Sequence, residues 1–285
     1  MRTLVNFSIL FALVVIILGA YTRLTDAGLG CPDWPGCYGH LTVPVEAEKA
    51  AAAQARFPDA PLEHHKAWNE MVHRYAAGIL GLLILAIAIT AMVRVRKHPE
   101  TPVKLPLFLL ALVTFQAALG MWTVTLNLQP LVVMGHLLGG FTTLSLLYLL
   151  RLRLQRVHIP LGDPRARKLG GLALFALIVV VMQIALGGWV AANYAALACT
   201  ELPICEGSWS QQLDIAGAFS VPEAVTYQYG AHDYAERMTM HVAHRIGAIV
   251  TIVVVGLMLL RGYKNAQSSV IKGSLNWVAL ALIVQ

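Results

Sequence analysis

The sequence predicts an all-α polytopic membrane protein built from two four-helix-bundle repeats. Three observations support this class: the chain is 58% hydrophobic, its mean hydropathy is +0.66, and its two halves share a cysteine-containing motif. Charged residues make up 13% of the chain, about half their share in soluble domains, which argues against a soluble protein. The net charge of +6 does not indicate a nucleic-acid partner, because the basic residues form short clusters between apolar runs.

The apolar runs predict the membrane helices, since a bilayer core requires about 20 apolar residues per helix. A seventh helix begins near Leu275, and the sequence ends within it at Gln285. The first run is interpreted as a retained helix and not as a signal peptide, because residues 19–39 directly after it belong to the repeated motif. The six full-length runs are residues 5–21, 71–93, 105–126, 131–150, 169–191 and 238–260.

The loops predict the orientation, because Lys and Arg remain on the cytoplasmic side during insertion. Basic residues gather in the second, fourth and sixth loops, whereas the odd loops, about 22–70, 127–130 and 192–237, are poor in base and contain most of the acids. The N-terminus is therefore expected in the cytoplasm of a bacterial inner membrane. Both cysteine pairs, Cys31/Cys37 and Cys199/Cys205, then face the oxidising periplasm, where each pair is expected to close a disulfide.

An internal repeat predicts the domain organisation. Sliding the chain over itself by 168 residues matches the stretch from Leu18 to Gly39 with that from Leu186 to Gly207, including both cysteines of each pair. A His-Arg pair also recurs, at an offset of 171. We therefore expect units 1–151 and 152–285, each a four-helix bundle, with an eighth helix beyond residue 285 and parallel topology.

Three histidines near the outer ends of predicted helices are candidate heme ligands: His73, His136 and His244. An ionisable residue in a membrane helix indicates function by default. A lone histidine there is more often structural, but three at matching depth favour axial iron ligation, with His73 and His136 on opposite sides of one macrocycle. His241 and His244 point the same way on one helix, so the second site needs a partner histidine from the eighth helix.

Charged neighbours of these histidines have two interpretations each. Glu70, one turn before His73, either moves protons and stabilises positive charge during an oxidation, or simply favours the helix dipole. Arg74 and Arg245 are either interfacial residues or partners of heme propionates. His241 corresponds to His73 at the offset of 168 and to Glu70 at the offset of 171. Under the second alignment the two halves differ at the acid, which predicts one reacting site and one electron-transfer or structural site.

Taken together, the residues from Gly19 to Cys37, Glu70-x-x-His73-Arg74, Gly135-His136 and His244-Arg245 resemble the heme A synthase family over the whole chain. The resemblance implies oxidation of a methyl group of heme O to a formyl group, giving heme A for cytochrome oxidase, by successive hydroxylations and loss of water. It also implies eight helices in two bundles, a heme b cofactor, and the two disulfides named above. Carried over, His73 and His136 flank the substrate heme, Glu70 assists the chemistry, and His244 ligates heme b.

Partners and rival functions follow from the same residues. The expected partners are heme O, the heme O synthase that supplies it, an electron donor or acceptor, and membrane lipid; homo-oligomerisation stays open. One rival is a di-heme b-type cytochrome that only transfers electrons, in which Glu70 has no task. The other rival is a heme carrier or assembly chaperone, which would exchange heme without redox turnover.

Overall fold

The computed structural model is helical in the part of the chain that it describes, residues 1–155, 159, 162–202 and 205–285. Within these residues the only β-pairing is an isolated bridge between Cys37 and His40. The described part contains six helices long and apolar enough to cross a membrane, which confirms an all-α integral membrane protein. The eighth span and the repeat architecture stay predictions. The six helices are α1 (Arg2–Leu24), α3 (His64–Arg94), α4 (Lys104–Thr125), α5 (Pro130–Gln155), α7 (Gly170–Ala192) and α9 (Tyr234–Asn265).

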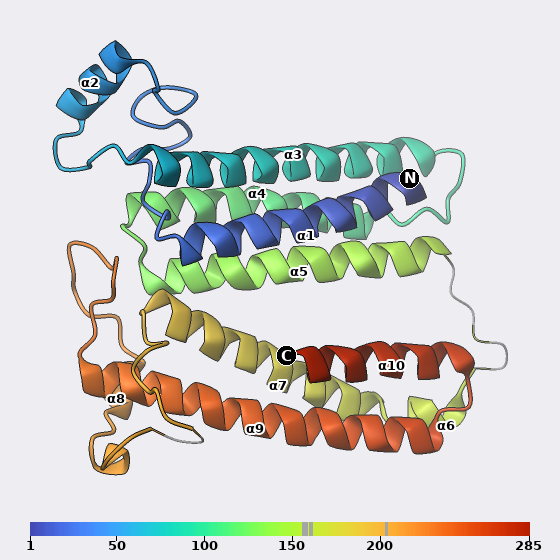
Figure 1. Cartoon of the computed structure of the whole chain (residues 1–285). Helices are drawn as coiled ribbons and strands as arrows, with labels where there is room; N and C mark the ends of the chain where they lie inside the picture. Colours follow the sequence, from blue (N-terminus) through green and yellow to red (C-terminus); the bar gives the residue numbers. More distant parts are fainter. Residues whose placement is uncertain (156–158, 160–161, 203–204) are drawn as a thin grey trace. The chain divides into compact units, whose positions relative to one another are not determined.

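The chain divides into two compact units, and the first comprises Met1–Arg156 with Ala224–Gln228. In this unit α1 and α4 each pack against both α3 and α5, so the four helices form a closed bundle (Figure 1). Its core is apolar, with Ile84, Leu109 and Leu147 fully buried. A short helix, α2 (Ala47–Arg56), lies in the loop beyond the end of α3 that carries His64.

The second unit comprises Val157–Glu223 and Tyr229–Gln285. Its long helix α9 packs against α7, against α10 (Ser269–Val284), and against the short helices α6 (Pro164–Arg167) and α8 (Ile215–Ala218). A 3-10 turn, η1, spans Trp209–Gln211. Because α9 contacts every other α-helix of this unit, its residues are held from several sides.

The helices extend further than the apolar runs from which they were predicted. The second and sixth helices begin at His64 and Tyr234, not near residues 71 and 238, because polar residues continue the helix beyond the apolar core. At the start of α9, Asp233 and Glu236 form a capping box that satisfies free backbone N–H groups. The seventh helix likewise begins at Ser269, after the N-cap Ser268, and not near Leu275. Hydropathy therefore locates the membrane-embedded part of a helix and not its ends.

The turn between α4 and α5 fixes the start of the helix that carries His136. Asn127 and Leu128 both adopt positive φ, 49° and 64°, which reverses the chain in a few residues. Pro130 then occupies the first helical position, where its missing N–H leaves no hydrogen bond unmade. This short turn keeps α4 and α5 antiparallel and adjacent.

Candidate functional site

The first unit brings His73 of α3 and His136 of α5 together. Their ring centroids lie 6.4 Å apart and the ring planes are nearly perpendicular, at 89°. Two aromatic rings in direct contact reach similar separations, so the distance alone does not identify a ligand pair. The hydrogen bonding is more informative: Nδ1 of each ring is buried and has no partner among the described residues.

This geometry fits an iron macrocycle held from two sides. An imidazole nitrogen binds a transition metal at about 2 Å, so two rings on opposite sides of one iron have centroids roughly 6 Å apart. The separation between His73 and His136 agrees with that value. Buried imidazole nitrogens without a partner carry a desolvation cost that a bound group would offset. The residues present therefore fit a heme between α3 and α5.

Glycines face both rings from neighbouring helices. A Cβ at Gly19 of α1 would lie 2.9 Å from Cε1 of His73, and one at Gly120 of α4 would lie 3.4 Å from Cε1 of His136. The first distance is shorter than real Cβ contacts allow, so any side chain at Gly19 must displace the imidazole. Glycine at position 19 therefore sets where the His73 ring can lie, whereas an added Cβ at Gly120 would make only ordinary contact with His136.

Glu70 lies at the junction between α3 and the first disulfide loop. Its side chain is buried; Oε1 pairs with Nη2 of Arg74, and Oε2 accepts a hydrogen bond from the backbone N–H of Cys31 at 2.9 Å. Both carboxylate oxygens are therefore engaged within the protein. The acid one turn before His73 also anchors the loop.

Arg74 has a structural task that sequence analysis did not predict. Nη1 donates to the backbone carbonyls of Asp33, at 2.9 Å, and of Gly36. Arg74 thus ties the loop closed by the Cys31–Cys37 disulfide onto α3. A role of Arg74 toward a heme propionate stays a prediction.

The loop approaches α3 closely because Gly30 has no side chain. A Cβ at Gly30 would lie 2.6 Å from the backbone carbonyl of Lys66, closer than real Cβ contacts allow. Inside the loop, the carboxylate of Asp33 accepts from the backbone N–H groups of Tyr38 and Gly39 at 2.6 and 2.7 Å. Tyr38 is buried, and its hydroxyl donates to the carbonyl of Pro61 at 3.0 Å. Burial and the nearby carboxylate of Glu63 raise the pKa of Tyr38 above its ordinary value.

The second unit repeats this docking with different side chains. Arg245 donates to the backbone carbonyls of Cys199, at 3.0 Å, and Glu201, and Cys199 is disulfide-bonded to Cys205. At the 168-residue offset Glu201 corresponds to Asp33, so both arginines use an equivalent carbonyl. The place of Glu70 is taken by His241, whose Nδ1 lies 3.1 Å from the carbonyl oxygen of Ala195.

The second disulfide loop has an acid of its own. Glu206 accepts from the hydroxyl and the backbone N–H of Thr200, and from the backbone N–H of Glu201. These hydrogen bonds, the hydroxyl of Thr200 above all, hold the pKa of Glu206 at about 2. The carboxylate stays ionised at physiological pH and orders the loop near Arg245.

His244 contacts two residues of α7. Its Nδ1 lies 3.1 Å from Nε2 of Gln183, and a Cβ at Gly187 would lie 3.0 Å from its Cε1. Gly187 therefore faces His244 as Gly19 faces His73. Sequence analysis gave Gln183 no role. A signal was present, because the sequence Gln-x-x-x-Gly occurs both at Gln116–Gly120 and at Gln183–Gly187.

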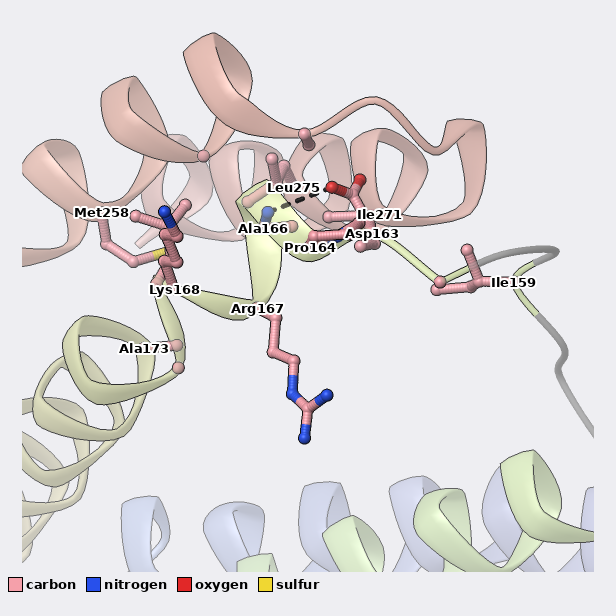
Figure 2. Close-up of a pocket in the computed structure, with 15 residues that line it drawn as sticks. Ile159, Asp163, Pro164, Ala166, Arg167, Lys168, Ala173, Met258, Ile271 and Leu275 are labelled. Carbon is pink, nitrogen blue, oxygen red and sulfur yellow. Dashed lines mark hydrogen bonds between the residues drawn. The ribbon is translucent and has the colours of Figure 1, made fainter.

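The second unit contains a cavity away from His244. It measures about 730 Å³ and is lined by residues of α6, α7, α9 and α10, including Asp163, Met258 and Leu275 (Figure 2). Asp163 accepts from the backbone N–H of Ala166, as the dashed line marks, and from those of Gln267 and Ser268. Met258 is 14 residues along α9 from His244, roughly 20 Å at the helical rise. The cavity is therefore separate from His244.

Comparisons with known proteins identify relatives over nearly the whole chain. The family model described as cytochrome oxidase assembly protein matches residues 2–285. The heme A synthase of Shewanella oneidensis is 51% identical over 99% of this chain and 83% of its own length. The heme A synthases of Shouchella clausii and of a Chelativorans species are 30% and 29% identical over 69% and 85% of this chain, and over 61% and 68% of their own lengths. The chain thus belongs to the cytochrome oxidase assembly protein family.

Proposed function

We propose that this protein is a heme A synthase, an oxidoreductase that converts a methyl group of heme O to the formyl group of heme A. The observation that carries the proposal is the His73–His136 pair, with centroids 6.4 Å apart and two buried Nδ1 atoms that have no hydrogen-bond partner in the part of the chain that the structure describes. The names of the relatives agree with it. In this proposal His73 and His136 hold the substrate heme from opposite sides within the first bundle.

Glu70 is the proposed catalytic residue. Its carboxylate lies one helical turn before His73, and Arg74 and the Cys31 N–H hold it in place. A negative charge fixed there would stabilise positive charge that develops on the methyl carbon as it is oxidised, or accept the proton that leaves. Its second task is to anchor the disulfide loop through the Cys31 N–H.

His244 is the proposed ligand of a heme b cofactor in the second unit. When bound, heme b supplies one-electron redox chemistry. Gly187 leaves space for the imidazole, and Gln183 contacts its Nδ1. His241 hydrogen-bonds Ala195 in place of an acid equivalent to Glu70, which favours a redox site over a second oxidising site.

The proposed location is a bacterial inner membrane with the N-terminus in the cytoplasm. The proposal includes two four-helix repeats, spanning residues 1–151 and from 152 onward, with eight helices in all. Both disulfides would then lie in periplasmic loops, where they can form. Oxidising a methyl to a formyl group removes electrons, so an electron acceptor is required, and a heme O synthase would supply the substrate.

The test is to express the full chain together with a heme O synthase and to extract and identify the hemes. The wild type is expected to accumulate heme A, and Glu70→Ala is expected to leave heme O unconverted. A pigment that never contains a formyl group would favour an electron-transfer cytochrome instead. Heme O that is bound and exchanged without any conversion would favour a heme carrier.

A further inference from the structure

The contact between α7 and α9 has a reciprocal shape. Gln183 and Gly187 lie one turn apart on α7, and His244 and Gly247 lie about one turn apart on α9. Gly187 leaves space for the imidazole of His244, and Gly247 leaves space for the amide of Gln183, which a Cβ there would overlap. Each glycine therefore makes room for the polar side chain of the other helix.

The contact between α4 and α5 has the same arrangement. Gln116 and Gly120 on α4 face His136 and Gly139 on α5. A Cβ at Gly139 would overlap the Gln116 amide, whereas a Cβ at Gly120 would make ordinary contact with the imidazole, 3.4 Å from Cε1. Gln116 is 8% exposed, and its Nε2 has no partner among the described residues. The Nδ1 of His136 lacks a partner too. In the second unit the equivalent two atoms are hydrogen-bonded, at 3.1 Å.

The contact between α1 and α3 keeps the glycine but lacks the glutamine. Gly19 faces His73, while Val15 occupies the position of Gln183 and Ala76 that of Gly247 at the same repeat offsets. In the contact between α1 and α3, Val15 and Ala76 thus replace both the glutamine and the glycine of the pair. This joint exchange indicates that the glycine makes room for the glutamine amide. His73 and His136 each interact with the backbone carbonyl at this position, of Val15 and of Gln116, so the two contacts differ in the side chain there.

The chemistry of an amide beside a ligand histidine is specific. Iron bound at Nε2 leaves the proton on Nδ1, which then needs an acceptor. Nε2 of Gln183 also donates to the backbone carbonyl of His244 at 3.1 Å. Turning the amide by half a turn gives up that hydrogen bond and brings Oε1, which is buried and has no partner among the described residues, against Nδ1. An acceptor at Nδ1 fixes the ring orientation and makes the imidazole a stronger donor to the metal.

We propose that Gln116 and Gln183 are positioning residues that fix His136 and His244 as permanent heme ligands, whereas His73, without such an amide, is the exchangeable ligand of the substrate heme. The inference rests on the proposed function and deepens it. A substrate heme must enter before oxidation and leave afterwards, which requires one ligand that releases it. Cofactor heme has no such requirement.

The test measures the midpoint potential of each heme in the purified full-length protein. Gln183→Glu puts a stronger acceptor at Nδ1, which stabilises ferric iron and lowers the potential of heme b. Gln183→Leu removes the acceptor and raises that potential. Gln116→Glu and Gln116→Leu are expected to act in the same two directions on the substrate heme alone. Opposite shifts from the two variants are not expected of a glutamine that only fills space.

Substitutions in the contact between α1 and α3, where the glutamine-glycine pair is missing, provide the matched control. Val15→Leu is expected to leave both potentials unchanged, because it introduces no amide beside His73 and keeps the backbone carbonyl that interacts with the ring. The double variant Val15→Gln with Ala76→Gly installs the missing pair and is expected to lower the substrate-heme potential. It is also expected to slow the release of heme by roughly the 10–100-fold typical of such outer-shell contacts.

Two results separate the possible failures. If wild type forms heme A while the Glu and Leu variants of either glutamine shift the potential in the same direction, or not at all, the positioning role is wrong and the proposed function stands. If the wild type binds heme but never forms heme A, the proposed function is wrong and the assignment of His73 as the exchangeable substrate ligand fails with it.

Discussion

The carboxylate of Glu70 accepts the backbone N–H of Cys31 at 2.9 Å while it pairs with Arg74. The residue proposed to assist oxidation is therefore also the attachment point of the first disulfide loop. The two tasks are separable, because the loop needs only an acceptor at this position whereas the chemistry needs a charge.

Glu70→Ala is expected to loosen the first disulfide loop. Breaking a buried ion pair costs about 3–5 kcal/mol, and the side chains of Glu70 and Arg74 are only 6% and 12% exposed. Hydrogen exchange at the Cys31 N–H measures the effect. Glu70→Gln keeps an acceptor for that N–H and is expected to retain more of the protection while still losing activity. Glu63→Ala, which removes a surface pair with Lys66, is the control and should change protection little.

Arg245→Lys is expected to weaken the attachment of the second disulfide loop. The guanidinium reaches the carbonyls of both Cys199 and Glu201, and an ammonium cannot reproduce this planar geometry. Hydrogen exchange of the loop and of the start of α9 should rise relative to wild type. Arg237→Lys is the control, because among the described residues the Arg237 guanidinium hydrogen-bonds only the exposed carbonyl of Asp233. Equal protection in both variants would show that Arg245 does not hold the loop.

Gly19→Ala is expected to displace the His73 ring. The new Cβ would lie 2.9 Å from Cε1, and overpacking of this kind costs about 1–3 kcal/mol. The expected result is weaker binding of heme O to the first unit, measured by titration. Gly78→Ala on α3 is the matched control, since no heavy atom lies within 4 Å of its added Cβ. An equal loss of heme affinity in both variants would contradict the proposal that Gly19 leaves space for the His73 ring.

Tyr38 makes the outer loop of the first unit sensitive to alkaline pH. Its pKa is raised by burial, so the protonated form favours the folded loop. The stability that it contributes is complete below the ordinary tyrosine pKa of about 10 and is lost as the pH rises through the raised value. Tyrosinate absorbance, compared between wild type and Tyr38→Phe, follows this titration. A Tyr38 signal that titrates below pH 10 would contradict the effect of burial.

Sequence patterns predicted the membrane helices and the histidines but not the contacts around them. The length of an apolar run is set by the thickness of the bilayer, so the apolar cores of the six spans could be predicted from the sequence. The helical extension from His64 to Glu70 could not, because these residues are polar and their helicity depends on packing of the disulfide loop. The loop-holding role of Arg74 depends on backbone carbonyls, which sequence does not position.

The repeat carried more information than the motif alone. The sequence contains Gln-x-x-x-Gly twice, at Gln116–Gly120 and Gln183–Gly187. That Val15 and Ala76 stand where the second half has Gln183 and Gly247 could be interpreted only from the structure, which places Gly247 beside the Gln183 amide. The cysteine pairs were predictable from spacing and orientation, and the structure joins both.

The binding of substrate heme by His73 and His136 is tested most directly by electron paramagnetic resonance of the protein loaded with ferric heme O. The account predicts a low-spin, bis-histidine signal in wild type, lost or converted to high spin in His73→Ala and in His136→Ala. The exposed His65, on the same helix as His73, is the control, and His65→Ala should retain the signal. An undiminished low-spin heme O signal in both His73→Ala and His136→Ala would contradict the account.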